Sequence, residues 1–195
     1  MDKPSRWGSV DTSIYDKKWA EMAKAGHDPH GEVAFIQRFD PTTVLDAGCG
    51  TGRVAIELAN RGIDAMGTDV DDTMLAAARE KAPELDWALA DLASLDLRTA
   101  AGEQRRFDVV AMPGNVMIFV ATGTEGAVLQ RCADHLEPEG LLIAGFQLGR
   151  GLDPETYDRL ATAAGLWPVG RFATWDGDPW VAGGGYLVAV HRLNP

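Results

Sequence analysis

A strand, a glycine-rich turn and a helix start follow one another between Val44 and Arg53, and no other feature constrains the fold as much. The segment reads VLDAGCGTGR, and the residues that follow it, VAIELANRG, have the apolar spacing of a helix. Glycine permits positive φ and carries no Cβ, so a strand can turn sharply into a helix while its backbone amides approach a ligand closely. The segment therefore predicts a cradle for a nucleotide-like cofactor.

The spacing of the glycines bears on the class of cofactor. A dinucleotide-binding fingerprint, G-x-G-x-x-G, would place its third glycine at position 53, which is Arg53; the glycine stands at Gly52 instead. An acid, Asp46, also stands two residues before Gly48. Both observations weaken the interpretation as an NAD site. An NAD-dependent oxidoreductase stays open as an alternative.

Strand and helix patterns alternate along the chain after residue 42. We expect strands at 43–46, 63–68, 85–89, 107–112 and 140–146, and helices at 52–60, 72–81, 123–136 and 154–164. Such alternation predicts a parallel sheet with helices on both faces. Two apolar stretches, 169–175 and 186–192, flank a loop rich in Asp and Gly and predict a hairpin that adds an antiparallel strand.

Length and composition limit the classes of protein. The 195 residues, 46% of them hydrophobic, suit one domain, with helices expected at 12–25 and 29–39. A net charge of −11, with no basic run beyond Arg105 and Arg106, argues against a nucleic-acid partner. No apolar stretch nears the roughly 20 residues of a membrane span, and the N-terminus lacks the apolar core of a signal peptide. We therefore expect a cytoplasmic protein. Cys49 and Cys132 suggest neither a disulfide framework nor a metal site.

The segment from Asp46 to Gly52 resembles the first motif of the Rossmann-like (class I) S-adenosylmethionine-dependent methyltransferases of the small-molecule type. The resemblance continues in register, with Asp69 ending the next apolar strand and Asp91 following the third. It implies a doubly wound, mostly parallel seven-stranded sheet with an antiparallel C-terminal hairpin strand. It also implies one methyltransferase domain, in which residues 1–40 form a helical lid and residues 41–195 form the catalytic core.

The resemblance also implies roles for particular residues around S-adenosyl-L-methionine. Asp46 would organise its amino-acid end, Asp69 would hold the ribose hydroxyls and Asp91 would lie near the adenine amino group. The expected cofactor-binding residues are Asp46, Gly48, Cys49, Gly50, Gly52, Asp69, Val70, Asp91, Leu92 and Met112. The neighbouring acids Asp71 and Asp72 are instead expected to cap the helix that starts there.

The loop from Met112 to Phe119 is where the resemblance places the chemistry. Family members that methylate amide or adenine nitrogens carry an acid or asparagine followed by two prolines and an aromatic residue here, whereas this chain reads MPGNVMIF. That departure argues against those substrates. Asn115 could orient a nucleophile, although asparagine after Pro-Gly is also a turn residue. His27 and His30 could act as a general base or serve only as solvated or capping residues.

The resulting hypothesis is transfer of a methyl group from S-adenosylmethionine to a nucleophilic oxygen, nitrogen or carbon of a small acceptor. Such a reaction needs alignment and exclusion of water more than a dedicated set of catalytic side chains. The alternatives are the NAD-dependent oxidoreductase and a non-catalytic module that binds S-adenosylmethionine but has lost the acceptor site. The sequence leaves open the acceptor and the oligomeric state.

Overall fold

A computed structural model of the chain describes residues 30–194 together with Lys17, Glu21 and Lys24. The helix expected at 12–25 therefore lies almost wholly outside the described residues, as does His27.

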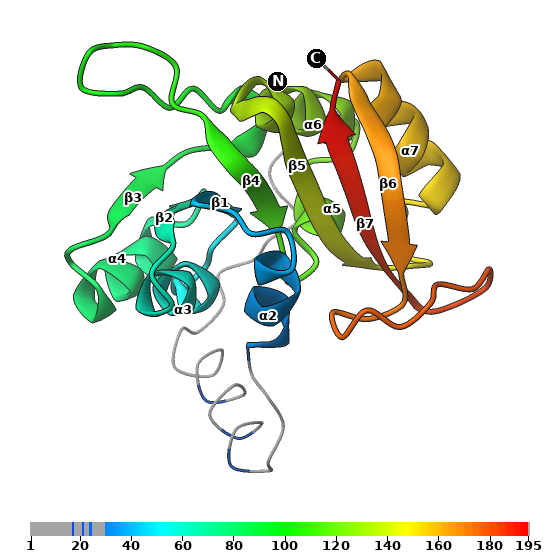
Figure 1. The fold of residues 1–195 in the computed structure, drawn as a ribbon, viewed down its shortest axis with the longest axis horizontal. Helices are drawn as coiled ribbons and strands as arrows, with labels where there is room; N and C mark the ends of the chain where they lie inside the picture. The colour runs from blue at the N-terminus through cyan, green and yellow to red at the C-terminus, as the bar shows by residue number, and fades with distance from the viewer. Residues whose placement is uncertain (1–16, 18–20, 22–23, 25–29, 195) are drawn as a thin grey trace.

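Seven strands form one sheet in the order β3-β2-β1-β4-β5-β7-β6 (Figure 1). The strands are β1 (Thr43–Ala47), β2 (Asp64–Asp69), β3 (Asp86–Leu89), β4 (Phe107–Met112), β5 (Leu136–Gln147), β6 (Leu166–Phe172) and β7 (Tyr186–Leu193). Strands β1 to β5 pair in parallel, and β7 is antiparallel to both of its neighbours, β5 and β6. The expected mostly parallel seven-stranded sheet with an antiparallel C-terminal strand is confirmed.

Helices cover both faces of this sheet because successive strand residues point to opposite sides. The helices are α2 (Gly31–Gln37), α3 (Arg53–Asn60), α4 (Asp72–Lys81), α5 (Val116–Phe119), α6 (Glu125–Asp134) and α7 (Pro154–Ala163), with a short 3-10 turn at Leu92–Ser94. In β1, Val44 packs with α2 and α3, whereas the next residue, Leu45, belongs to the opposite core with α6 and α7. No helix in this described part is long and apolar enough to cross a membrane.

The order of the strands places the site. The chain leaves β1 to form β2 and β3 on one side, then crosses over to form β4 on the other. The loops that follow β1 and β4 therefore diverge at the carboxyl ends of these strands, and open α/β sheets bind ligands in such a crevice. The glycine turn from Gly48 to Gly52 follows β1 at this edge.

Several elements differ from those expected, among them β6, which spans Leu166–Phe172 and not 169–175. Strand β5 begins at Leu136, before the expected residue 140, because Leu136 pairs with Phe107 ahead of a register shift, and Glu139 in the shifted stretch has a φ of 65°. Helix α2 is shorter than the expected 29–39. The one-turn helix α5 has no counterpart in the sequence expectations, because four residues are too few to show helical periodicity.

Candidate functional site

A cavity opens at the carboxyl ends of β1 to β4 and encloses about 810 Å³, counting the part open to solvent. It is lined after β1 by Gly48 and Gly50, at the end of β2 by Asp69 and Val70, after β3 by Ala90, Asp91 and Leu92, and after β4 by Pro113, Gly114, Val116, Phe119, Val120 and Ala121. Six of the ten expected cofactor-binding residues lie in this lining. The wall after β4 is apolar, and the opposite side carries two carboxylates.

The backbone conformation and the close packing of the turn require glycine at positions 48 and 52. Gly48 and Gly52 both have a φ of 84°, and a Cβ on Gly48 would come within 2.6 Å of Val116 Cγ2. A Cβ on Gly52 would meet the Trp87 ring at the same distance, so Gly52 serves the packing of the turn. The buried thiol of Cys49 has its pKa raised by burial, so it stays protonated and acts as a small packing residue.

Asp69 joins the turn to the end of β2. Its Oδ2 accepts a hydrogen bond from the Gly50 amide at 2.8 Å, and its Oδ1 accepts one from the Asp71 amide at 3.0 Å. Desolvation raises the pKa of Asp69 against these hydrogen bonds. A carboxylate lining the cavity is thereby fixed in orientation, as a ligand for hydroxyl groups must be.

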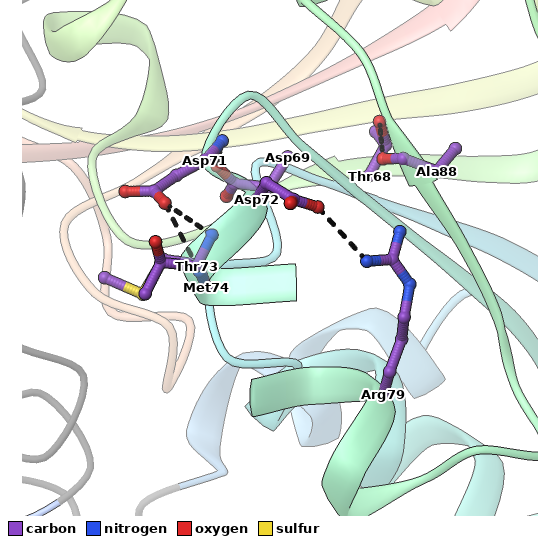
Figure 2. A network of polar contacts seen from close by, with 8 residues as sticks. All are labelled: Thr68, Asp69, Asp71, Asp72, Thr73, Met74, Arg79 and Ala88. Atoms are coloured by element: carbon purple, nitrogen blue, oxygen red, sulfur yellow. Dashed lines mark hydrogen bonds and ion pairs between the residues drawn. The ribbon is translucent and has the colours of Figure 1, made fainter. Parts of the chain in front are cut away.

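The neighbouring acids Asp71 and Asp72 do not share this role. Figure 2 shows Asp71 accepting hydrogen bonds from the amides of Thr73 and Met74, and Asp72 paired with Arg79. Asp71 is the N-cap of α4 and Asp72 lies in its first turn. The expectation that both acids serve the helix start is confirmed.

Asp91 and Leu92 lie after β3, on the wall opposite the apolar one. Asp91 begins the 3-10 turn and accepts a hydrogen bond from the Ala93 amide at 2.9 Å. Val70 is 49% exposed, although it is apolar, and it lies in the lining together with the buried Leu92. Apolar side chains on either side of a cavity suit a flat ring between them.

A second, smaller cavity of about 230 Å³, counting the part open to solvent, adjoins the first. Gly48, Pro113 and Gly114 line both cavities. The remaining walls of the smaller one come from Asp46, Cys49, Arg53 and Val54. The two cavities therefore adjoin each other at the glycine turn and the loop after β4.

Asp46 is an unusual buried acid in this second cavity. It is 1% exposed, its Oδ2 accepts a hydrogen bond from the Ala55 amide at 3.1 Å, and its Oδ1 has no hydrogen-bond partner among the described residues. Burial raises the pKa of Asp46 from 3.8 to about 7, against the lowering effect of the Ala55 amide and of Arg53. An incompletely satisfied buried carboxyl group is costly and needs an explanation.

Arg53 brings a positive charge to the same cavity. Its two terminal nitrogens bind both carboxylate oxygens of Glu32 on α2, at 3.0 and 2.6 Å, and both side chains are nearly buried. This bidentate geometry fixes the guanidinium in orientation. In the sequence, Arg53 was considered only as the residue that replaces the third glycine of a dinucleotide-binding fingerprint. A signal was present, because a cation in the first turn of a helix opposes the helix dipole and so needs another reason to be there.

The other expected residues are placed as follows. Met112 is fully buried and lines neither cavity, and Gly52 lines neither. Asn115 lies between lining residues without being one, and His30 precedes α2 outside both linings. Between residues 30 and 194, no three His, Cys, Asp or Glu side chains come together in a way that could hold a metal ion.

The loop from Met112 to Phe119 was expected to border the chemistry, but none of the residues that line the apolar wall from Pro113 to Ala121 was among the expected cofactor-binding residues. The available signal for this wall was the Pro-Gly pair directly after β4, at the edge where the ligand crevice was expected.

Comparison with known proteins finds proteins that are similar to this chain in sequence and in fold. Residues 44–140 match the family model described as methyltransferase domain. A solved TehB-like SAM-dependent methyltransferase from Corynebacterium glutamicum is 32% identical, with a TM-score of 0.85 over 94% of this chain and 98% of that one.

Two curated proteins are also similar. A cypemycin N-terminal methyltransferase from Streptomyces sp. is 30% identical over 88% of this chain and 67% of its own length. A ubiquinone biosynthesis O-methyltransferase from Bradyrhizobium diazoefficiens is 26% identical over 70% of this chain and 62% of its own length. The chain spans about two thirds or less of the length of the curated relatives that it matches.

Proposed function

The chain belongs to the S-adenosylmethionine-dependent methyltransferases, and from that membership we propose that it transfers the methyl group of S-adenosylmethionine to a small-molecule acceptor. The acceptor atom is a nucleophilic oxygen, nitrogen or carbon. The proposal rests on the family and on the chemistry of the two adjoining cavities.

One observation carries the proposal furthest: the two cavities match the two halves of this cofactor. The larger cavity offers Asp69 to ribose hydroxyls and the apolar pair Val70 and Leu92, beside Asp91, to an adenine ring. The smaller one offers the carboxyl group of Asp46 and the guanidinium cation of Arg53. A nucleoside joined to an α-amino acid has this order of groups, with an ammonium to face Asp46 and a carboxylate to face Arg53.

Two features of the site support the fit. The unpartnered Oδ1 of buried Asp46 gains a partner when a cation enters the second cavity. The absence of a side chain at Gly48 leaves the junction of the cavities open, since a Cβ there would collide with Val116. The first feature would otherwise be only a cost to stability.

In the proposed mechanism the protein binds, orients and excludes water. When bound, S-adenosylmethionine supplies a methyl group on a positively charged sulfur, which needs little further activation. Asp69 and Asp91 would hold the nucleoside, and Asp46 and Arg53 would hold the amino-acid end, on either side of the junction that Gly48 and Gly114 line. Alignment of this kind supplies a large part of the rate enhancement of a two-substrate reaction.

The general base stays a prediction. His30 and Asn115 lie outside the lining of both cavities, and His27 lies outside the described residues. We propose that residues 1–40 form a lid over the core formed by residues 41–195.

We propose a small-molecule partner in the cytoplasm and no nucleic-acid partner. The net charge of −11 disfavours a phosphate backbone. The two cysteines, Cys49 and Cys132, are buried free thiols, as suits a reducing compartment. The similarity to methyltransferases does not favour the two alternatives, an NAD-dependent oxidoreductase and a non-catalytic binding module.

The test is isothermal titration of the full chain with S-adenosylmethionine and with S-adenosylhomocysteine, the demethylated product. Binding of both is expected, and the melting temperature should rise with S-adenosylmethionine but not with NADH. Failure to bind either compound, or stabilisation by NADH alone, would contradict the proposal. Methyl transfer to any acceptor in a screen of small molecules would exclude the non-catalytic module.

A further inference from the structure

The loop after β4 is held in an unusual backbone conformation at the junction of the two cavities. Gly114 and Asn115 have φ values of 74° and 73°, so two consecutive residues are left-handed. Asparagine is one of the few residues with a side chain that adopts this conformation readily. Pro113 and Gly114 line both cavities, and Val116 lines the larger one.

Asn115 fastens this loop to the neighbouring strand β5 at two points. Its amide donates a hydrogen bond to the Gly145 carbonyl at 3.1 Å, and its side-chain Oδ1 accepts one from the Gln147 amide at 2.7 Å. Both partners lie at the carboxyl end of β5. The side-chain oxygen therefore occupies the place that a strand neighbour would take, and it fixes where β4 ends and the loop begins.

The anchor also sets the contact between the loop and the glycine turn. Val116 follows Asn115 directly and lies so close to Gly48 that a Cβ there would approach its Cγ2 to 2.6 Å. A shift of the loop would therefore move the wall at the point where both cavities meet. Packed side chains transmit such a shift because the interior has few voids.

We propose that Asn115 is a positioning residue of the methyl-transfer centre, whose side-chain oxygen holds Pro113 and Gly114 against the transferable methyl group. This inference rests on the proposed function. Asn115 acts through the backbone of the loop and does not itself touch the acceptor. A displacement of about 1 Å at a reacting centre is enough to lower a rate by on the order of a hundredfold, so a fixed wall has catalytic value.

Three variants separate the anchor from other roles. Asn115→Gly keeps the left-handed backbone but removes the oxygen, whereas Asn115→Asp keeps both the oxygen and a tolerance for positive φ. Asp153→Ala is the matched control, because Asp153 caps α7 by accepting a hydrogen bond from the Thr156 amide at 2.7 Å, and it lines neither cavity. It removes a similar side-chain to backbone bond and lowers stability by a similar amount.

The readout is the ratio of the dissociation constants of S-adenosylhomocysteine and S-adenosylmethionine, measured by titration of each full-length variant. Asn115→Gly is expected to weaken S-adenosylmethionine at least threefold more than S-adenosylhomocysteine, because only the former carries the methyl group that the wall contacts. Asn115→Asp should bind S-adenosylmethionine at least as tightly as the wild type, and Asp153→Ala should leave both constants within twofold.

An unchanged ratio in Asn115→Gly would overturn the positioning role. So would an equal change in Asp153→Ala, or a loss in Asn115→Asp as large as that in Asn115→Gly. Absence of binding by the wild type would instead contradict the proposed function, so the two failures are distinguishable.

Discussion

Asp46 on β1 is a buried carboxylate, whereas Asp158 on α7, which packs beside the other half of the sheet, is partly buried. The Oδ2 of Asp158 forms an ion pair with Arg171 of β6, and its Oδ1, which has no hydrogen-bond partner among the described residues, lies 3.3 Å from His191 Nε2 of β7. The Arg171 guanidinium also lies over the Trp180 ring, 5.1 Å from its centroid. Within the described part of the chain, Asp46 accepts a hydrogen bond from the Ala55 amide alone, and it faces a cavity.

This difference in partners distinguishes an acid that stabilises the fold from one that serves a ligand site. Asp158 is provided with a cationic partner from the chain itself, so it ties α7 to the C-terminal strands. Asp46 lies in the same cavity as Arg53, but Arg53 is bound through both terminal nitrogens to Glu32. A buried acid whose partner is left to be supplied from outside marks a ligand site, whereas one whose partner is built in marks a structural contact.

The largest expected effect concerns the pH dependence of stability at Asp46. Below pH 3.8 its carboxyl group is protonated in both the folded and unfolded chain, and it contributes nothing. Between pH 3.8 and about 7 the unfolded chain releases this proton while the folded chain retains it, because burial raises the pKa in the fold. Stability is therefore lost as pH rises, by on the order of 4 kcal/mol above pH 7.

Asp46→Asn removes this loss, since the amide does not ionise. Urea unfolding of wild type and variant without ligand should show the variant gaining in relative stability from pH 4 to pH 8. If the difference in unfolding free energy between the two proteins stayed constant over that range, ionisation of Asp46 would not destabilise the fold. The comparison between the two acids would then fail.

A second effect tests the structural partner. Asp158→Ala leaves Arg171 without its carboxylate and is expected to lower the free energy of unfolding by about 2–3 kcal/mol, since the pair is only partly screened by solvent. The dissociation constant of S-adenosylhomocysteine should stay within twofold. The control is Asp96→Ala, which removes an exposed pair with Arg98 and should change stability by less than about 0.5 kcal/mol. Loss of ligand binding in Asp158→Ala would contradict the assignment of Asp158 to a structural contact and of Asp46 to the ligand site.

A third effect concerns the other cavity acid. Asp69→Ala should weaken binding of S-adenosylmethionine and S-adenosylhomocysteine alike, by about 1–3 kcal/mol, because a charged hydrogen bond to ribose is lost. Asp72→Ala is the matched neighbour, since Asp72 pairs with Arg79 and lines neither cavity. Titration should detect no more than a twofold change for it. Equal losses in both variants would mean that local charge, not ribose contact, determines binding.

The smallest expected effect is the pH dependence of cofactor affinity. With its pKa raised by burial to about 7, Asp46 is mostly protonated at pH 6 and mostly ionised at pH 8. A cationic ammonium group binds the ionised form, so affinity should rise by about tenfold, or roughly 1.4 kcal/mol, over this interval. Asp46→Asn should bind more weakly at pH 8 and show little of this rise. A wild-type affinity independent of pH would contradict the pairing.

The turn from Gly48 to Gly52 and the acids Asp46, Asp69 and Asp91 were foreseeable because local patterns determine them. A strand end, a glycine and an acid at fixed offsets are visible in one segment of the chain. The C-terminal hairpin was equally local, since alternation and turn residues mark both strands. These features explain why a mostly parallel seven-stranded sheet with an antiparallel C-terminal strand was expected correctly.

The remaining features depend on contacts between distant segments. Glu32 meets Arg53 only after α2 packs beside α3, and Gln147 meets Asn115 only after β4 and β5 pair. The start of β5 was missed because Glu137 to Gly140 has the composition of a turn, yet the strand absorbs it as an irregularity. No periodicity in one segment reports such pairings.

The central claim is that the two adjoining cavities hold one molecule of S-adenosylmethionine. Crystals of the full chain grown with S-adenosylhomocysteine test it most directly. The account predicts density for adenosine beside Asp69 and Asp91, with the amino-acid end between Asp46 and Arg53. Density for the ligand elsewhere, or an amino-acid end directed away from Asp46 into solvent, would contradict the claim.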